Sequence, residues 1–179
     1  RPRVLTIIKG ELLLKGGLAG IFLGSGYIFQ TLGLSLTTPA ITGFITGLYV
    51  VITPILAIFF LKMRIDFLGW IAVLLATVGL LVLSFNGLDV SWGAFSVFIS
   101  AIFFAAHIVA LGAWSSKFDV YAMTTVQLGT CALLTTLAAI PGGITGPVGG
   151  NGWLVVIFTA FFATVFAFII QTWAQSIIA

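Results

Sequence analysis

The chain has very few charged residues, and this shortage decides its class. Only 6% of its 179 residues are charged, whereas a soluble globular domain carries charge at roughly 25% of its positions. Such a chain cannot cover a surface that faces water. Hydrophobic residues make up 61% of it and are spread along its whole length, so lipid must be its main solvent. A soluble domain with a single membrane anchor is excluded.

Residues that commonly do chemistry are scarce as well. The chain has one cysteine, Cys131, and one histidine, His107. A single cysteine forms neither an intrachain disulfide nor a cysteine-based metal site, and these two residues without a buried acid cannot supply a nucleophile, a base and an orienting group. The excess of 7 basic over 4 acidic residues is too small for a nucleic-acid surface. The sequence therefore predicts no enzyme, no catalytic residue, no metal, no cofactor and no nucleic-acid partner.

Six apolar segments are long enough to cross a bilayer as helices. A helix needs about 20 apolar residues to cross the ~30 Å hydrocarbon core, and its backbone polar groups must be satisfied within the segment. The predicted spans, named A to F, cover about residues 16–36, 40–61, 67–85, 92–113, 120–140 and 153–174. The last break between them, Pro141 to Gly152, is uncharged and rich in glycine, which predicts a flexible loop. The predicted fold class is all-α integral membrane, a multi-helix bundle of six transmembrane helices.

The basic residues fall on one side of this predicted bundle. Four precede span A, two join B to C and one joins D to E, whereas the other three loops have none. Lysine and arginine in short loops are retained in the cytoplasm, so we expect a multi-pass protein of a plasma membrane of the bacterial inner-membrane type, with both chain ends cytoplasmic. Each of the five tryptophans lies near a predicted span end, as expected for a ring that prefers the headgroup level: Trp70, Trp92, Trp114, Trp153 and Trp173.

Spans A and F end in similar sequences. Residues Ile28–Ser35 and Ile169–Ser176 align without a gap and share an Ile, a Gln, a Thr and a Ser, including the pairs Gln30-Thr31 and Gln171-Thr172. The two spans are five apart, so the copies cross the membrane in opposite directions. This pattern predicts an inverted-topology repeat, the construction of many secondary transporters. The alternative is that each amide is satisfied by a neighbouring helix near the membrane edge.

Three stretches of sequence resemble EamA-type transporters of the drug/metabolite transporter superfamily. Residues 26–61, GYIFQTLGLSLTTPAITGFITGLYVVITPILAIFFL, resemble the third and fourth helices of that family, while AIFFAAHIVAL at 101–111 and IIQTWAQ at 169–175 are similar to its sixth and eighth. Many members carry a Glu before the basic residue after the fourth helix, where this chain has Lys62-Met63-Arg64.

The resemblance implies ten helices in two inverted halves, of which spans A to F are helices three to eight. It assigns residues 1–85 to the first repeat and 86–179 to the second, and it implies two further helices at each end.

Polar residues form stripes on three of the predicted spans. In span B they recur at i, i+4, i+7 and i+11, which is one face of a helix with 3.6 residues per turn. The stripes comprise Thr42, Thr46, Tyr49 and Thr53 in span B; Ser96, Ser100, Phe103 and His107 in span D; and Thr124, Gln127, Cys131 and Thr135 in span E. We predict that these spans line a path for a small-molecule substrate, to which Gln30 and Gln171 also contribute. The alternative is that hydroxyls bond the carbonyls of their own helix one turn back.

Three other residues of span B suggest how it packs. Gly43 and Gly47 form a small-xxx-small pair that would let another helix approach closely. Pro54 lacks a backbone donor, which predicts a kink near Val50. Span C has Thr77 as its one stripe-like polar residue, so we expect it to face lipid or a partner protomer in a homodimer.

His107 is the one residue deep in a span that ionises near neutral pH, and an intramembrane ionisable group is by default a candidate for function. It either binds substrate or carries a proton, or it is a neutral imidazole bonded between helices. The function that these patterns and the family resemblance together imply is export of small metabolites, amino acids or amphipathic drugs by alternating access. The alternatives are an ion pore, which lacks a filter motif, and a six-span structural subunit without transport activity.

Overall fold

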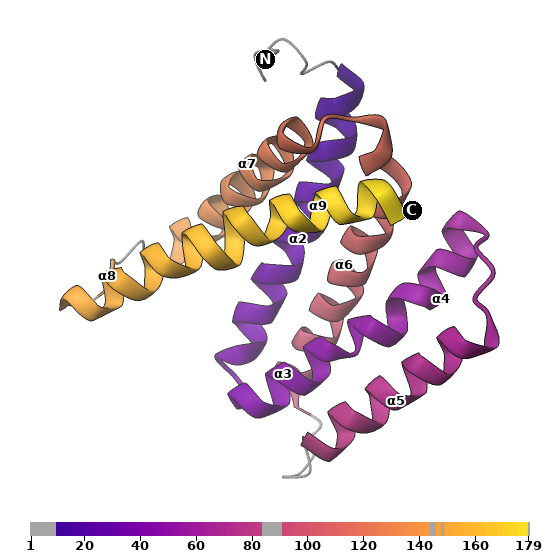
Figure 1. Cartoon of the computed structure of the whole chain (residues 1–179). Helices are drawn as coiled ribbons and strands as arrows, with labels where there is room; N and C mark the ends of the chain where they lie inside the picture. Colours follow the sequence, from indigo (N-terminus) through magenta and orange to yellow (C-terminus); the bar gives the residue numbers. More distant parts are fainter. Residues whose placement is uncertain (1–9, 84–90, 144–145, 148, 179) are drawn as a thin grey trace. The chain divides into compact units, whose positions relative to one another are not determined.

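The computed structural model describes residues 10–83, 91–143, 146–147 and 149–178. Helices account for nearly all of this part of the chain, and it contains no strand. The predicted all-α membrane class is therefore confirmed. Figure 1 shows the helices in chain order.

In the described part of the chain, five helical segments are long and apolar enough to cross a membrane, and a sixth apolar helix, α5, is shorter. The predicted break at residues 86–89 lies outside the described residues. The α-helices are α2 (Gly10–Leu34), α3 (Pro39–Gly47), α4 (Tyr49–Leu61), α5 (Phe67–Leu83), α6 (Trp92–Trp114), α7 (Val120–Ala139), α8 (Gly149–Phe158) and α9 (Ala167–Ile178). Two short 3-10 helices are η1 (Ser115–Lys117) and η2 (Ile140–Gly142), and η3 (Thr159–Phe166) is a π-helix between α8 and α9.

The chain forms two compact units, and helices α2 and α6 each contribute to both. Unit 1 comprises Arg1–Ile21 and Leu111–Ala179, and unit 2 comprises Phe22–Ala110. The described helices of unit 1 are the first half of α2, the end of α6, and all elements from η1 to α9. Unit 2 holds the rest of α2 and α6 together with α3, α4 and α5.

The core of unit 1 packs the start of α2 against α7 and the end of α6. Five side chains are buried there: Leu12, Ala19, Leu111, Ala122 and Met123. Gly20 makes the closest approach between α2 and α7, because a Cβ at this position would lie 2.6 Å from Thr130 Cβ. Small residues at such crossings let helices approach in a bilayer, where lipid gives no hydrophobic drive for association. The Lys15 ammonium lies 4.6 Å from the centre of the Trp114 ring.

The core of unit 2 packs α3 against the start of α6. It is formed by Phe44 and Ile45 of α3 with Ala94 and Val97 of α6. Gly33 of α2 lies against the same part of α6, since a Cβ on it would lie 2.7 Å from the carbonyl oxygen of Gly93. Helix α5 contacts α3 and α4, and Figure 1 shows α4 and α5 side by side.

Span B is interrupted two residues before Val50, where the sequence predicts a kink. The helix is interrupted at Leu48, between α3 and α4, where the Leu48 N–H bonds the Ile45 carbonyl at 3.1 Å. Pro54 lies one and a half turns further on and cannot donate to the carbonyl of Val50. The ends of the span are fixed by Thr38, whose side chain caps the N-terminus of α3, and by Lys62 in the left-handed region at φ 54°.

One expectation about the segment before the last span was wrong. The predicted loop from Pro141 to Gly152 is shorter than expected. The 3-10 helix η2 covers its first two residues, and α8 begins at Gly149. Four residues with poor helix propensity are helical there because a helix satisfies their backbone groups near the apolar core. The span is also not uniformly α-helical, since its centre is the π-helix η3, in which Thr164 Oγ1 donates to the Thr159 carbonyl at 3.2 Å.

Candidate functional site

A hydrogen bond between two neutral side chains joins α2 and α3 in unit 2. Gln30 Nε2 donates to Thr46 Oγ1 at 3.0 Å, and both residues are half-buried. Gln30 keeps its amide oxygen and its second N–H for other partners. The sequence identified both residues as candidates, and the structure brings them together.

A second polar contact joins α2 to α6 at Phe29, the residue of α2 before Gln30. Ser96 Oγ donates to the Phe29 carbonyl at 2.8 Å, and the Phe29 ring stacks on Phe103 with centroids 5.7 Å apart and planes at 12°. Tyr27 and Phe104 form a similar contact, edge to face, at 5.4 Å. We call the group of Gln30, Thr46, Ser96 and the Phe29–Phe103 pair the polar seam of unit 2.

Two hydroxyls beside the seam are buried and unsatisfied. Thr42 on α3 is 6% exposed and Ser100 on α6 is 0% exposed, yet neither hydroxyl has a hydrogen-bond partner among the described residues. Leaving a buried hydroxyl without a partner costs roughly 1–3 kcal/mol. His107, two turns beyond Ser100 on the same helix, is 2% exposed.

Other candidate hydroxyls bond within their own helix. Thr53 Oγ1 donates to the Tyr49 carbonyl at 2.7 Å, and Thr135 Oγ1 donates to the Cys131 carbonyl at 2.9 Å. Thr77 on α5 does the same to Val73 at 2.7 Å. Such bonds satisfy the hydroxyl without any second helix or ligand, so at these positions the geometry favours the alternative that the sequence left open.

Unit 1 has a neutral pair of its own, between α7 and α9. Gln127 Nε2 donates to Thr172 Oγ1 at 2.9 Å, and both residues are fully buried. Gln171, the preceding residue of the repeated Gln-Thr pair, is only half-buried. Thr124, one turn before Gln127, is 3% exposed, and its hydroxyl has no partner within the described part of the chain.

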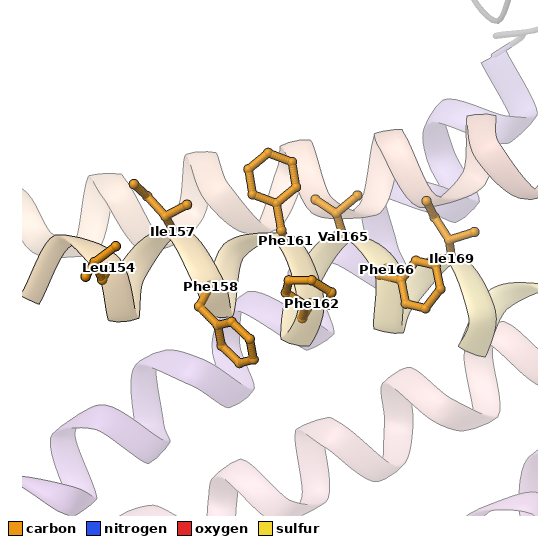
Figure 2. Close-up of a pocket in the computed structure, with 8 residues that line it drawn as sticks. All are labelled: Leu154, Ile157, Phe158, Phe161, Phe162, Val165, Phe166 and Ile169. Atoms are coloured by element: carbon orange, nitrogen blue, oxygen red, sulfur yellow. The ribbon is translucent and has the colours of Figure 1, made fainter. Parts of the chain in front are cut away.

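The last span carries a groove of about 460 Å³ that is apolar throughout. Figure 2 shows its lining, which comes from α8, η3 and α9: Leu154, Ile157, Phe158, Phe161, Phe162, Val165, Phe166 and Ile169. Ligand sites combine apolar walls with a few polar groups that orient the ligand, and this groove offers no such side chain. Its exposed phenylalanines suit contact with lipid instead.

The sequence predicts that another helix packs against Gly43, and no described helix of unit 2 does so. A Cβ on Gly43 would meet no atom within 4 Å, while the close approaches of this unit fall at Gly26, Gly33 and Gly93. Whether Gly43 and Gly47 receive another helix stays a prediction. The described residues also contain no group of three His, Cys, Asp or Glu side chains that could hold a metal ion.

Sequence reasoning missed the partners that complete the seam. The Phe29 carbonyl and the Tyr27 ring carry no periodic signal, because a backbone carbonyl has no side-chain pattern and neither residue belongs to a polar stripe. Their one sequence signal is that Tyr27 and Phe29 lie within three residues of Gln30 in the same helix.

Comparisons with known proteins agree with these features. Residues 4–85 match the model of the EamA-like transporter family. Over 173 residues, or 96% of the chain, the sequence is 33% identical to a protein of Archaeoglobus fulgidus named "Uncharacterized transporter". The chain spans about half of that relative, 56% of its length. No solved structure matches the chain.

Proposed function

Because the chain belongs to the EamA-like transporter family, we propose that the protein moves small metabolites, amino acids or amphipathic drugs across a plasma membrane. The proposed mechanism is alternating access between two inverted repeats, with net export. The predicted repeats at 1–85 and 86–179 would supply the two moving parts, as in other carriers built from inverted halves.

The observation that carries this proposal is the half-buried Gln30–Thr46 bond of the polar seam. A neutral amide and hydroxyl at 3.0 Å can exchange their mutual bond for bonds to a solute. The cost of this exchange is small, since interhelical side-chain hydrogen bonds in membranes contribute only about 0.6 kcal/mol on average. A solute can therefore open the seam and close it again.

Topology and partners form the second part of the proposal. The basic residues Lys15, Lys62, Arg64 and Lys117 all fall in the loops or span starts that we assign to the cytoplasm. Helix α5 exposes a continuous set of large apolar side chains, including Phe67, Leu68, Leu74 and Leu75, which suits lipid or a second copy of the protein.

A structural membrane subunit is the competing function, and one observation favours it. The Gln127–Thr172 pair is fully buried and already satisfied, as expected for polar residues that only fix helix packing. In a structural subunit, the polar seam of unit 2 would likewise only fix how its helices pack.

A counterflow assay distinguishes a carrier from a structural membrane subunit. The intact protein that contains this chain is reconstituted in liposomes loaded with unlabelled leucine and uridine, and uptake of each radiolabelled compound is compared with protein-free liposomes. A carrier accumulates at least one label, and His107→Ala or Gln30→Leu lowers that accumulation at equal protein content. A structural subunit accumulates neither label, and the same substitutions change only its thermal stability.

A further inference from the structure

The last span changes its helical register in the middle. Figure 1 shows α8 and α9 as one continuous rod, but the element that joins them, η3, is a π-helix. The Ala167 N–H bonds the Phe162 carbonyl, five residues back, and Thr164 Oγ1 donates to the Thr159 carbonyl, also five residues back. An α-helix makes its backbone bonds to the fourth residue back, so η3 holds one residue more than the same turns of an α-helix.

Nothing within η3 accounts for this extra residue. The span has no glycine or proline from Trp153 to Ile178, and no residue of η3 is buried. Helix α9, in contrast, is held in place by the Gln127–Thr172 bond to α7 and by the burial of Phe168. The extra residue therefore sets which side of α9 is buried.

Removal of the extra residue would turn α9 by one position. If α8 stays in place and η3 becomes α-helical, each residue of α9 moves to the place that the following residue occupies now. One residue turns a side chain by about 100°. Gln171 would then lie opposite Gln127 in place of Thr172, and Ala174 would take the place of Gln175.

The present register and the shifted register each have a cost that the other lacks. Gln175 Oε1 is buried without a partner in the described part of the chain, which destabilises the present register, and the shift moves this atom off the buried side. Gln171 is half-buried, and its amide can donate to or accept from the Gln127 amide. Against the shift, Ala167 would replace Phe168 and leave the space of a buried ring unfilled.

We infer that the last span is a two-state element, in which η3 converts between a π-helix and an α-helix while α9 turns and Gln171 replaces Thr172 opposite Gln127. The shifted register makes the two repeated Gln-Thr sequences alike, because Gln30, which aligns with Gln171, makes the interhelical bond of its own copy. This switch goes beyond the proposed transport function and does not depend on it.

Cysteine crosslinking distinguishes the two registers. In the intact protein with its native cysteines replaced, including Cys131→Ala, a short bifunctional thiol reagent is applied to Gln127→Cys combined in turn with Thr172→Cys, Gln171→Cys and Trp173→Cys. We expect the first two pairs to crosslink and the Trp173→Cys pair to crosslink severalfold less, because the switch turns α9 in one direction only. Equal crosslinking at Gln171 and Trp173, or crosslinking at Thr172 alone, would overturn the inference.

Deletion of Ala163 is the matched control. It removes one residue of η3 at an exposed position, so that an entirely α-helical span keeps Thr172 opposite Gln127. We expect the Thr172→Cys crosslink to persist and the Gln171→Cys crosslink to fall to the level of Trp173→Cys. A Gln171→Cys crosslink that survives the deletion would come from general motion of α9, and the inference would be wrong. Loss of the Thr172→Cys crosslink would show that the contacts of α9 do not fix its register, which would equally overturn it.

Discussion

The two units each contain one hydrogen bond between a glutamine amide and a threonine hydroxyl, and the two bonds differ in burial rather than in length. Gln30 and Thr46 in unit 2 are half-buried and 3.0 Å apart. Gln127 and Thr172 in unit 1 are fully buried and 2.9 Å apart. Under the proposed function, the same chemistry serves two purposes. A solute cannot reach a fully buried pair, whereas a half-buried pair can exchange its mutual bond for bonds to a solute.

The pairs also use the repeated Gln-Thr sequence differently. In the first copy the glutamine, Gln30, makes the interhelical bond and Thr31 is exposed. In the second copy the threonine, Thr172, makes it, and Gln171 is half-buried. One residue along a helix turns a side chain by about 100°, so the two copies present different faces to their neighbours.

The largest effect is expected at the glycines where helices approach most closely. A methyl group on Gly20 would overlap the Gln127 carbonyl, and one on Gly33 would overlap Val97. We expect Gly20→Ala and Gly33→Ala each to lower the free energy of unfolding by about 1–3 kcal/mol, or more where backbone must move. Thermal unfolding of the intact protein in detergent measures this loss. Gly43→Ala is the control, because its methyl group would meet nothing within 4 Å; a comparable loss there would show that a further helix packs on Gly43.

The next effect is expected at the buried pair of unit 1. Gln127→Leu leaves the Thr172 hydroxyl buried without its donor, and we expect a loss of about 1–2 kcal/mol in the free energy of unfolding. Flux per folded molecule should not change. A double-mutant cycle with Thr172→Val isolates the pair, and additive losses would contradict a direct bond between the two side chains.

The half-buried pair should show the opposite behaviour. Gln30→Leu should cost only about 0.6 kcal/mol of stability but should reduce counterflow severalfold, because the solute loses an amide partner. Thr31→Val is the matched control, since Thr31 is the next residue of the same helix and is exposed. If Gln30→Leu lowers the free energy of unfolding as much as Gln127→Leu does and leaves counterflow unchanged, the Gln30–Thr46 pair only fixes helix packing, as the Gln127–Thr172 pair does.

Much of the fold could be predicted because lipid imposes one simple requirement. Every crossing segment must satisfy its own backbone, so length and hydropathy located the five described segments that are long enough to cross a membrane and the shorter helix α5. The π-helix at Thr159–Phe166 could not be predicted in this way, because an α-helix and a π-helix satisfy the same backbone groups and differ only in register.

Less of the candidate site could be predicted, because the spacing of polar residues identifies one face of a helix but not the residues that bond to that face. The stripe of span B contains Thr46, bonded across to Gln30, and Thr53, bonded to its own helix. The two threonines are indistinguishable in the sequence. Which of them is shared depends on whether α2 passes within reach, and the sequence of span B does not contain that distance.

The smallest effect is expected at Thr53 itself, and it tests whether self-bonded hydroxyls belong to the path. Thr53 Oγ1 bonds the Tyr49 carbonyl at 2.7 Å, so Thr53→Val removes a bond that no second helix uses. We expect a change in unfolding free energy within about 0.5 kcal/mol and counterflow equal to that of the unsubstituted protein. Thr46→Val, seven residues earlier on the same stripe, should lower counterflow because it removes the acceptor of Gln30. If the two variants lose counterflow equally, the whole stripe of span B meets the solute. A hydroxyl bonded to another helix would then contribute no more to transport than one bonded to its own helix.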